Sequence, residues 1–423
     1  MTTLRTRLAC IGALALAVRL AVVAATPGYH PVHDDASYAR VARWLLLVGH
    51  YPGHDLPGGG SQVSAYRPPG WPATLWGTWE LLGSGLASTR VVVAVIGALA
   101  AVLVGVLAGE VFGAGAALGA GVVAALSPLA IAVGASLESE TLFTALVLAA
   151  TWAALAARRS GAWRWLLAVG VLGGLAALTR TNGLVVVPAL ALVAATAAPT
   201  RWRRAARFAV PVVVAALVVA PWTVRNAVEL HAFVPVSTEV GNTLAGTYNP
   251  VSARHGAQWL EPQRTDAYHA IYRRYGASAA GDAALTRAVL RWVASHPGYP
   301  FVVAAHNGAR LLGLTGPAWA AFSLRTMSLG DDAGRLVWFG VLATTLLAAA
   351  GAWLGRRSAS ARLLWPVLVA LWLPAALVNG ELRLGAPAGA LMSVFVGLAL
   401  VRAAQRAPRS RAMRATAVSS RAD

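Results

Sequence analysis

Apolar residues occur in long runs along nearly the whole chain, and short polar stretches separate them. Ten runs are long enough, or nearly so, to cross the roughly 30 Å hydrocarbon layer of a membrane as helices. They cover residues 6–26, 88–109, 114–134, 140–157, 163–179, 183–198, 208–223, 335–354, 363–379 and 385–402. The pattern therefore predicts an all-α polytopic membrane protein with about ten transmembrane helices.

Residues 71–84 form a further apolar and aromatic run, but this run is short and contains Glu80. Charge decides its placement, because cytoplasmic loops of membrane proteins collect Lys and Arg. The five basic clusters are Arg5/Arg7, Arg158/Arg159/Arg164, Arg201/Arg203/Arg204/Arg207, Arg356/Arg357/Arg362 and the tail from Arg402 to Arg414. All five clusters lie on the same side of the membrane as the N-terminus only if residues 71–84 do not cross the membrane. We therefore predict an interfacial or re-entrant helix on the outer face, with both chain termini in the cytoplasm.

The predicted spans divide the chain into four parts. These are a transmembrane module at 1–223 with a first outer loop at 27–87, an outer region at 224–334, C-terminal transmembrane helices at 335–402 and a basic cytoplasmic tail at 403–423. Further helices are expected at 35–48, 264–275 and 283–295, and a glycine-rich loop at 57–60. An aspartate precedes the first of these helices, which is a favourable N-cap position.

Composition supports a membrane protein and excludes two other classes. Hydrophobic residues make up 57% of the chain and charged residues only 12%, about half the share found in soluble domains. The net charge of +19 comes from arginines between the apolar runs rather than on one face, which argues against binding to nucleic acid. The single cysteine, Cys10, lies inside the first span, so neither an intrachain disulfide nor a thiolate metal site can form.

The acidic residues point to a polar site on the outer side. In the predicted topology all of them except Glu110 and Asp423 face outward or lie at the outer ends of helices. Asp34 and Asp35 directly follow the first span. Two neighbouring carboxylates repel each other, so one of them could have a raised pKa and act as a general base. The alternative is a helix cap beside a solvated acid.

Three arginines on the outer side are candidate phosphate ligands. Arg67 lies in Tyr-Arg-Pro-Pro-Gly-Trp-Pro, where the prolines stiffen the turn that presents its guanidinium; a snorkelling arginine is the alternative. Arg180 lies in a very short outer connection, against the positive-inside bias, so it needs an anionic partner from the protein or a ligand. Arg225 ends a span on the same side.

Other polar residues lie near these candidates in the sequence. Glu138 and Glu140 lie between two spans, where acids are costly and indicate either function or helix capping. Glu381 and Arg383 lie at the outer end of the last hairpin and could pair with each other. The remaining candidates for acceptor contact or structural support are Tyr38 and Tyr66.

Bases and cations gathered at one leaflet suit group transfer from a lipid-linked phosphate. No P-loop, Gly-x-Ser-x-Gly, His-Glu-x-x-His or Cys/His metal pattern competes with this interpretation. A polytopic transporter or lipid flippase is the alternative; it predicts polar residues in mid-helix and an internal repeat, and neither is visible. A non-catalytic subunit of an envelope-assembly complex would need no convergent set of Asp and Arg residues.

Several short motifs follow one another in a specific order along residues 1–400. They are the acid pair after the first span, Arg-Pro-Pro-Gly-Trp-Pro, Ser-Glu opening a helix, Gly-Gly-Leu-Ala-Ala-Leu-Thr-Arg, Pro-Trp-Thr-Val-Arg-Asn, Val-Pro-Val-Ser-Thr-Glu-Val-Gly-Asn and Glu-Leu-Arg-Leu-Gly-Ala-Pro. This order, on one membrane side, resembles the GT-C membrane glycosyltransferases of the protein O-mannosyltransferase and aminoarabinose-transferase type (glycosyltransferase family 39).

The resemblance implies a GT-C fold and inverting transfer from a polyprenyl-phosphate sugar. It implies Asp34 as the general base, Arg67 as a ligand of the lipid phosphate, Arg180 as a basic residue near that phosphate, and Glu140 as the acid that opens the fourth helix. The second acid is Asp35 where the family usually has Glu, and the last motif lacks the aromatic residues usual around Arg383.

The expected partners are a polyprenyl-phosphate sugar, membrane lipid and a glycan, lipid or protein acceptor of the cell envelope. The expected location is the inner (plasma) membrane, with the active site on the extracytoplasmic face. No cofactor is required by these motifs; if a divalent metal ion takes part, Asp34, Asp35 and Glu140 are the groups that could hold it.

Overall fold

The computed structural model describes residues 3–51 and 64–419, with side chains as far as Arg406. The predicted glycine-rich loop at 57–60 lies outside the described residues. Every regular element within the described ranges is a helix. The apolar helices are α1 (Leu4–Ala25), α4 (Leu86–Phe112), α5 (Ala114–Leu126), α6 (Pro128–Val133), α7 (Glu140–Ser160), α8 (Trp163–Thr179), α9 (Gly183–Ala195), α10 (Arg201–Leu230), α17 (Gly334–Gly355), α19 (Trp365–Val378) and α20 (Ala386–Ser419).

Each predicted span coincides with apolar helix, which confirms the all-α membrane fold. Seven helical segments are long and apolar enough to cross a membrane in the part of the chain that is described. Three further apolar helices, α5, α8 and α9, are shorter, with 13 to 17 residues. The total of about ten spans therefore stays a prediction.

The predicted span at 114–134 is broken into α5 and α6. The break lies at Ser127–Pro128, because proline cannot donate the backbone hydrogen bond that would continue α5. Arg19, which is only 1% exposed in α1, donates to the carbonyls of Ala125 (3.3 Å) and Ala130 (3.2 Å), which lie on either side of the break. The arginine thus binds the first helix to the break in a later one.

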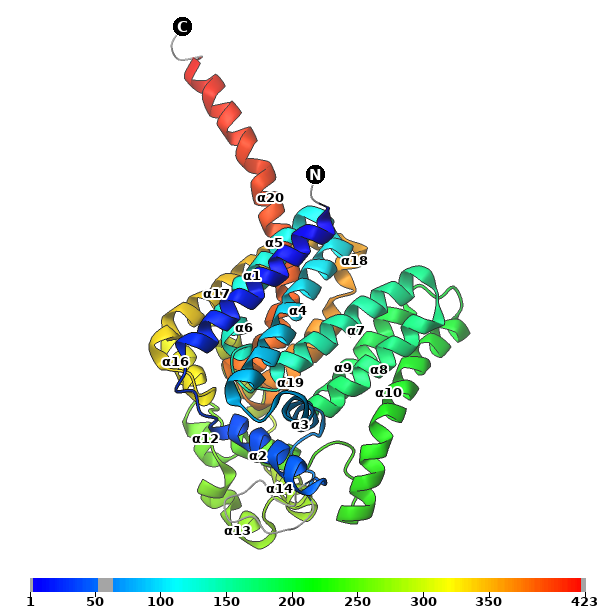
Figure 1. Ribbon diagram of the computed structural model, residues 1–423, viewed down its shortest axis with the longest axis vertical. Coiled ribbons are helices and arrows are strands. Elements are labelled where there is room, and N and C mark those ends of the chain that lie inside the picture. Colours follow the sequence, from blue (N-terminus) through cyan, green and yellow to red (C-terminus); the bar gives the residue numbers. More distant parts are fainter. Residues whose placement is uncertain (1–2, 52–63, 420–423) are drawn as a thin grey trace.

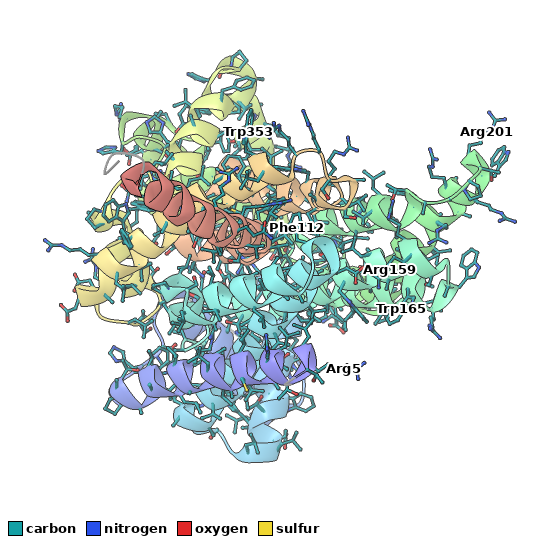
Figure 2. The ribbon with its side chains drawn as sticks, turned by 90° about the horizontal axis from the view of Figure 1, so that it is seen from above. Arg5, Phe112, Arg159, Trp165, Arg201 and Trp353 are labelled. Carbon is teal, nitrogen blue, oxygen red and sulfur yellow. The ribbon has the colours of Figure 1, made fainter. Side chains whose placement is uncertain are left out.

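Most of the remaining helices collect at one end of the bundle, opposite both chain termini, whereas the short α18 (Ala359–Arg362) lies at the end near the N-terminus (Figure 1). They include α2 (His33–Val48), α3 (Gly70–Leu82), α11 (Val240–Thr247), α12 (Pro250–Arg254), α13 (Asp266–Tyr275), α14 (Ala279–Ser295), α15 (Tyr299–Leu311) and α16 (Pro317–Thr326). The 13 residues of α3 reach about 20 Å, too short to cross the membrane alone. Figure 2 views the molecule from the opposite end, with Arg5, Arg159 and Arg201 at the ends of their helices.

One predicted local feature is wrong. Asp34 does not cap α2, because the helix begins at His33 and its N-cap residue is Val32, which makes no side-chain cap bond. Asp34 and Asp35 instead lie in the first helical turn, where the positive end of the helix dipole favours carboxylates. This register directs the two side chains about 100° apart around the helix, so they enter different surroundings.

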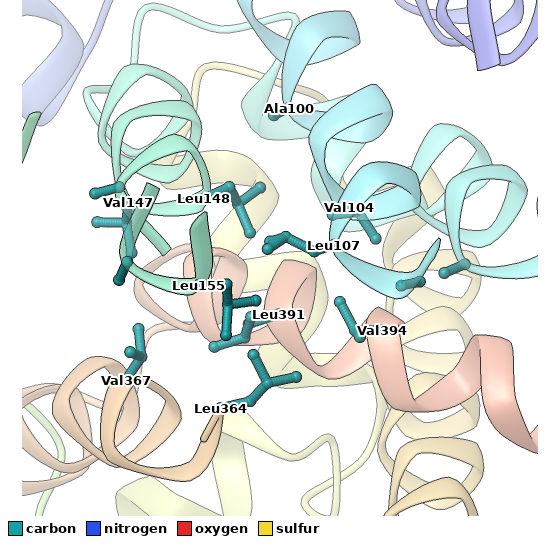
Figure 3. Close-up of a cluster of buried hydrophobic side chains, with 14 of the residues drawn as sticks. Ala100, Val104, Leu107, Val147, Leu148, Leu155, Leu364, Val367, Leu391 and Val394 are labelled. Carbon is teal, nitrogen blue, oxygen red and sulfur yellow. The ribbon is translucent and has the colours of Figure 1, made fainter. Parts of the chain in front are cut away.

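A continuous apolar core joins the membrane helices. Figure 3 shows side chains of α4, α7 and α20 meeting those near the start of α19, including Val104, Leu148, Leu155, Val367 and Leu391. A second cluster fixes α2 and α3 against the bundle. In it the indole of Trp71 is fully buried and donates to the carbonyl of Leu137 at 2.6 Å. Because aromatic residues bury large apolar areas, this contact holds the outer helices rigidly above the core.

Small residues allow α20 to pack closely against α5. A Cβ atom on Gly397 would overlap the carbonyl oxygen of Ala116 and lie 2.9 Å from Ala120 Cβ, whereas one on Gly389, in the same helix, would meet nothing within 4 Å. We expect Gly397→Ala to lower the free energy of unfolding by about 1–3 kcal/mol through overpacking. Thermal unfolding in detergent measures this loss. Gly389→Ala is the matched control, and equal melting temperatures for the two variants would contradict the prediction.

Candidate active site

Among the described residues, three arginines and five carboxylates form one connected group at the end of the bundle where α2 and α3 lie. We call it the arginine–carboxylate cluster; its members are Arg67, Arg180, Arg383, Asp34, Glu138, Glu140, Glu239 and Glu381. Asp34 lies on α2, and Arg67 lies in the segment before α3. Glu138 lies between α6 and α7, Glu140 begins α7, and Arg180 lies between α8 and α9. Glu239 directly precedes α11, and Glu381 and Arg383 lie in the segment before α20. The fold thus brings together residues separated by more than 300 positions.

Arg383 lies at the centre of this cluster. Its Nη2 contacts Asp34 at 2.5 Å, its Nη1 contacts Glu138 at 2.7 Å and Glu140 at 3.2 Å, and its Nε contacts Glu381 at 3.0 Å. The side chain is only 7% exposed. The expected pairing of Glu381 with Arg383 therefore exists, but it is one of four contacts that the same guanidinium makes.

Asp34 bridges Arg383 and Arg67. Arg67 Nη2 lies 2.5 Å from Asp34 Oδ1, and Arg67 Nε donates to Ser37 Oγ at 3.0 Å. Asp34 and Ser37 are three positions apart on α2 and so share a face. Burial tends to raise the pKa of Asp34, but the two arginines outweigh it and hold that pKa well below its usual range. Asp34 is therefore ionised at neutral pH.

Asp35 lies in a different environment. It is fully buried, accepts a hydrogen bond from the hydroxyl of Tyr29 and lies 3.4 Å from the backbone nitrogen of Leu137. Burial raises the pKa of Asp35 to about 8, although these bonds and Arg383 oppose the rise. Among the described residues its Oδ1 atom is buried without a hydrogen-bond partner, so the ionised form would leave a charged oxygen unsatisfied. The raised pKa thus belongs to the acid that faces the core, and burial rather than repulsion by Asp34 is its main cause.

Arg180 connects a second set of predicted residues. It is the C-cap residue of α8, and its Nη1 contacts Glu140 at 2.9 Å and donates to Ser139 Oγ at 2.8 Å. The hydroxyl of Tyr38 lies 3.2 Å from the same Ser139 oxygen. The anionic partner that Arg180 needs is therefore Glu140, which is fully buried. Ser139 occupies the N-cap position of α7 but makes no cap bond, because its hydroxyl faces the cluster.

Two tyrosine rings hold Arg67 in place. Its guanidinium lies 4.9 Å from the ring centre of Tyr38 and 5.1 Å from that of Tyr66, within the range of cation–π attraction. The backbone carbonyl of Arg67 accepts a hydrogen bond from Tyr51 at 2.6 Å. Pro69 directly precedes α3, so the arginine projects from a stiff junction rather than a mobile loop. Both predicted tyrosines therefore support a cation.

Arg225 lies outside the arginine–carboxylate cluster. Its Nη1 donates to the carbonyl of Ser64 at 2.8 Å, and its guanidinium lies over the rings of Trp222 and Tyr51. Among the described residues no ion pair joins Arg225 to the cluster. Because Ser64 is three positions before Arg67, the contact supports the segment that carries Arg67.

Glu239 is a member of the cluster that sequence reasoning missed. Its Oε2 lies 3.4 Å from Arg67 Nη1, and it occupies the N-cap position of α11 without a cap bond. Burial raises the pKa of Glu239 against the opposing effects of Arg67 and Arg180. The Ser-Thr-Glu motif could have indicated Glu239, because it places an acid in one of the segments that resemble the glycosyltransferase family.

The carboxylates named as groups that could hold a divalent ion do not form a metal site here. No group of three or more His, Cys, Asp or Glu side chains is arranged to hold a metal within the described ranges. Asp34 and Glu140 are engaged by arginines, and Asp35 faces Tyr29. A cation at this position would have to displace an arginine from a carboxylate, so we derive no step through a metal.

Two cavities are lined by residues that lie close to the cluster in sequence. One, of about 70 Å³, is lined by Thr141, which follows Glu140, and by Gly385, which follows Arg383. The other, of about 590 Å³, is almost entirely apolar, and Val185, Leu244 and Val378 are among its lining residues. A charged centre beside apolar space is a suitable arrangement for a ligand with a polar head and a hydrocarbon tail.

Known proteins resemble this chain both in sequence, over part of its length, and in fold. Residues 66–224 match the sequence profile of the family described as dolichyl-phosphate-mannose-protein mannosyltransferase. Among solved structures, the oligosaccharyltransferase AglB from Archaeoglobus fulgidus, in complex with an inhibitory peptide and a dolichol-phosphate, has a TM-score of 0.58 at 18% identity. That alignment covers 98% of this chain and 52% of AglB, so the chain spans about half of that protein's length.

The alignment with a second solved structure covers a larger share of that structure's chain. ArnT from Cupriavidus metallidurans, bound to undecaprenyl phosphate, is 18% identical over 94% of this chain and 78% of its own, with a TM-score of 0.45. No curated protein sequence matches the chain. From the helical architecture, the likeness to AglB and the matched segment we conclude that this chain is a multi-pass membrane protein with the GT-C fold, which carries the mannosyltransferase family pattern within residues 66–224.

Proposed function

We propose that this protein is a glycosyltransferase that moves a hexosyl or pentosyl unit from a polyprenyl-phosphate donor to a glycan, lipid or protein acceptor of the cell envelope. The observation that carries the proposal is the position of Asp34, an ionised carboxylate held between Arg67 and Arg383 at the outer end of a GT-C fold. An anionic base beside cations suits a reaction in which a proton is removed and a phosphate departs.

In the proposed step Asp34 accepts the proton of an acceptor hydroxyl or amine. The acceptor atom forms a bond to the anomeric carbon as the bond from that carbon to the phosphate oxygen breaks, and the phosphate oxygen keeps the electron pair. The products are the glycosylated acceptor and polyprenyl phosphate. Attack from the face opposite the departing phosphate inverts the anomeric configuration. Each carboxylate oxygen has two lone pairs, so Asp34 can accept this proton while it contacts an arginine.

Arg67 and Arg180 are the proposed ligands of the donor phosphate. Both lie near Tyr38. Arg67 lies over the Tyr38 ring, and Arg180 contacts the same Ser139 hydroxyl as the Tyr38 hydroxyl does. Cations held in place before the reaction stabilise charge that grows on the departing phosphate. The apolar cavity beside α9 and α19 offers space for the isoprenoid chain. Arg225 then supports Arg67 through Ser64 rather than binding the phosphate itself.

Donor binding would also strengthen Asp34 as a base. In the empty site Arg67 and Arg383 hold the pKa of Asp34 well below its usual range, so the carboxylate alone is a weak base. When Arg67 shares its charge with a phosphate, its attraction for Asp34 falls and the pKa of Asp34 rises. The base would therefore be strongest in the complex that contains the donor.

The proposed location is the plasma membrane, with the cluster on the extracytoplasmic face and both termini in the cytoplasm. Both termini lie at the end of the bundle opposite α2 and α13 (Figure 1). Arg158 lies in the last turn of α7 and Arg201 begins α10, so arginines flank the short α7–α8 and α9–α10 connections. The positive-inside bias assigns such connections to the cytoplasm.

The function is tested with purified protein and a panel of polyprenyl-phosphate sugars, with release of polyprenyl phosphate as the readout. We expect release that depends on an acceptor fraction from cell envelopes. Movement of the intact donor across vesicles without release would instead support a transporter or flippase. Release that persists when both Asp34 and Arg67 are substituted would assign the chain a non-catalytic role and the activity to a contaminant.

Arg67→Gln should mainly weaken donor binding. The substitution removes a charge-assisted contact to phosphate but keeps a side chain of similar length, and such contacts contribute about 1.5–3 kcal/mol, or roughly a tenfold to hundredfold change in the apparent donor affinity. Donor titrations of the transfer rate measure this change. Arg325→Gln is the control, because Arg325 forms an exposed ion pair with Asp331 outside the cluster. An unchanged donor affinity in Arg67→Gln would remove Arg67 from the phosphate site.

A further inference from the structure

Among the described residues, Arg67 contacts two carboxylates at unequal distances. Its Nη2 contacts Asp34 at 2.5 Å, whereas its Nη1 contacts Glu239 at 3.4 Å. The Glu239 side chain is 22% exposed, so solvent reaches this weaker partner. Between Asp34 and Glu239, Glu239 is therefore the carboxylate that a competing anion can replace at lower free-energy cost.

The backbone around Glu239 does not depend on its carboxylate. The N-terminus of α11 is held by Asp282, whose Oδ1 accepts a hydrogen bond from the backbone nitrogen of Gly241 at 2.5 Å. Thr238 donates its backbone N–H to the carbonyl of Ala65 at 2.9 Å, and this fixes the segment beside Arg67. The Glu239 carboxylate can thus rotate away by side-chain torsions alone, while the chain that carries it stays in place.

Charge in the cluster opposes the addition of another anion. Five carboxylates face three arginines, so a phosphate that binds Arg67 beside an ionised Glu239 would meet a like charge at the same guanidinium edge. The repulsion is relieved if Glu239 leaves Arg67 and becomes neutral. A buried carboxylate that loses its cation favours the protonated form.

We propose that Glu239 occupies the position of the donor phosphate on Arg67 while the site is empty, and that donor binding displaces this carboxylate and adds one proton to it. The proposal rests on the proposed function, which assigns the donor phosphate to Arg67. The step is an exchange: the phosphate takes the place of the carboxylate on Nη1, and a proton from solvent neutralises the displaced Glu239. No covalent bond of the donor changes.

The charged groups around Glu239 set the direction of the pH effect. They are Arg67 from the segment before α3, Arg180 between α8 and α9, Asp34 on α2 and Asp282 on α14. Burial already raises the pKa of Glu239, and loss of Arg67 removes an opposing effect, so the pKa in the complex exceeds that of the empty site. Between those two values binding takes up a proton, and donor affinity falls by up to about tenfold for each unit of rising pH.

The test measures binding of farnesyl methyl phosphate, a phosphodiester whose single charge does not titrate near neutral pH, to the full-length protein in detergent. Binding is measured at a lower and an upper pH that bracket the interval between the two pKa values of Glu239. For the wild type we expect weaker affinity at the upper pH and calorimetry in two buffers to show proton uptake between the two. Glu239→Gln removes the competing charge, so it should bind the diester about tenfold more tightly at the upper pH and lose the pH dependence. Glu239→Asp keeps the charge and should keep the dependence.

Glu261→Gln is the matched control, because Glu261 pairs with Arg264 at 2.6 Å away from the cluster, and it should behave as the wild type. Wild-type binding that is weakened by Arg67→Gln but unchanged by Glu239→Gln would overturn the role of Glu239 and leave the proposed function intact. Failure of the wild type to bind any phosphodiester at either pH would overturn both.

Discussion

Asp34→Asn should abolish detectable sugar transfer while the protein remains folded and inserted. An amide cannot accept the acceptor's proton, and loss of a positioned general base lowers rates by about 10²–10⁴-fold. The substitution keeps the size of the side chain, and its oxygen can still accept a hydrogen bond from Arg67 or Arg383, which Asp34 contacts in the native site. The rate of polyprenyl phosphate release at saturating donor is the measurement.

Asp266→Asn provides the comparison for this result. Asp266 is an exposed carboxylate in the first turn of α13, outside the arginine–carboxylate cluster, so the same chemical change there should leave transfer within twofold of the wild type. Full activity of Asp34→Asn, with an elution profile like that of the wild type, would remove Asp34 as the base. A profile that shows aggregation would be followed by Asp34→Glu, which retains a base and should recover part of the rate if the assignment is right.

Arg383→Gln should be the most destabilising substitution in the cluster. It would leave Glu138, Glu140 and Glu381 buried without the guanidinium that now contacts all three. Removing one partner of a buried ion pair typically lowers the free energy of unfolding by about 3–5 kcal/mol, because a charge remains uncompensated. Thermal and denaturant unfolding in detergent would show the loss.

A second variant separates the charge of Arg383 from its geometry. Arg383→Lys keeps the positive charge but cannot make the four directed contacts of the guanidinium, so its stability should lie between those of the wild type and the glutamine variant. Arg325→Gln, in an exposed ion pair, should stay within about 0.5 kcal/mol of the wild type. If the free energy of unfolding of Arg383→Gln also stayed within about 0.5 kcal/mol of the wild type, the surrounding carboxylates would already be neutral.

The membrane helices could be predicted from the sequence because their signal is local. A helix that crosses the hydrocarbon layer must be apolar where it crosses, and α4 and α7 contain such runs in the sequence. The break between α5 and α6 was missed, although Pro128 marks it, because a hydropathy window averages across a single proline. The register of α2 was missed because Asp34 resembles a cap residue, whereas the cap position is occupied by Val32.

The candidate site could be predicted only in part because its contacts join distant segments. The sequence indicated that Asp34, Arg67 and Arg180 share one membrane side, and in the structure Arg67 contacts Asp34 directly. Apart from the pair of Glu381 and Arg383, it did not indicate which carboxylates the arginines would contact. Arg383 lies 349 positions from Asp34, and no periodicity links two such residues. Glu239 was missed for the same reason, since its partner Arg67 is 172 positions away.

Arg19 has a consequence for how the protein is made. During synthesis α1 is complete long before Arg19 can make all of its contacts. Its partner Ala15, 2.9 Å away, lies in α1 itself, whereas the carbonyls of Ala125 and Ala130 follow 106 and 111 positions later. An arginine within a membrane helix costs about 2.5–3.5 kcal/mol on insertion scales until a partner arrives. The full set of Arg19 contacts therefore forms only when α6 has been translated, and a ribosome-bound fragment that ends before Ala125 would carry this arginine with Ala15 as its partner but without the carbonyls of Ala125 and Ala130.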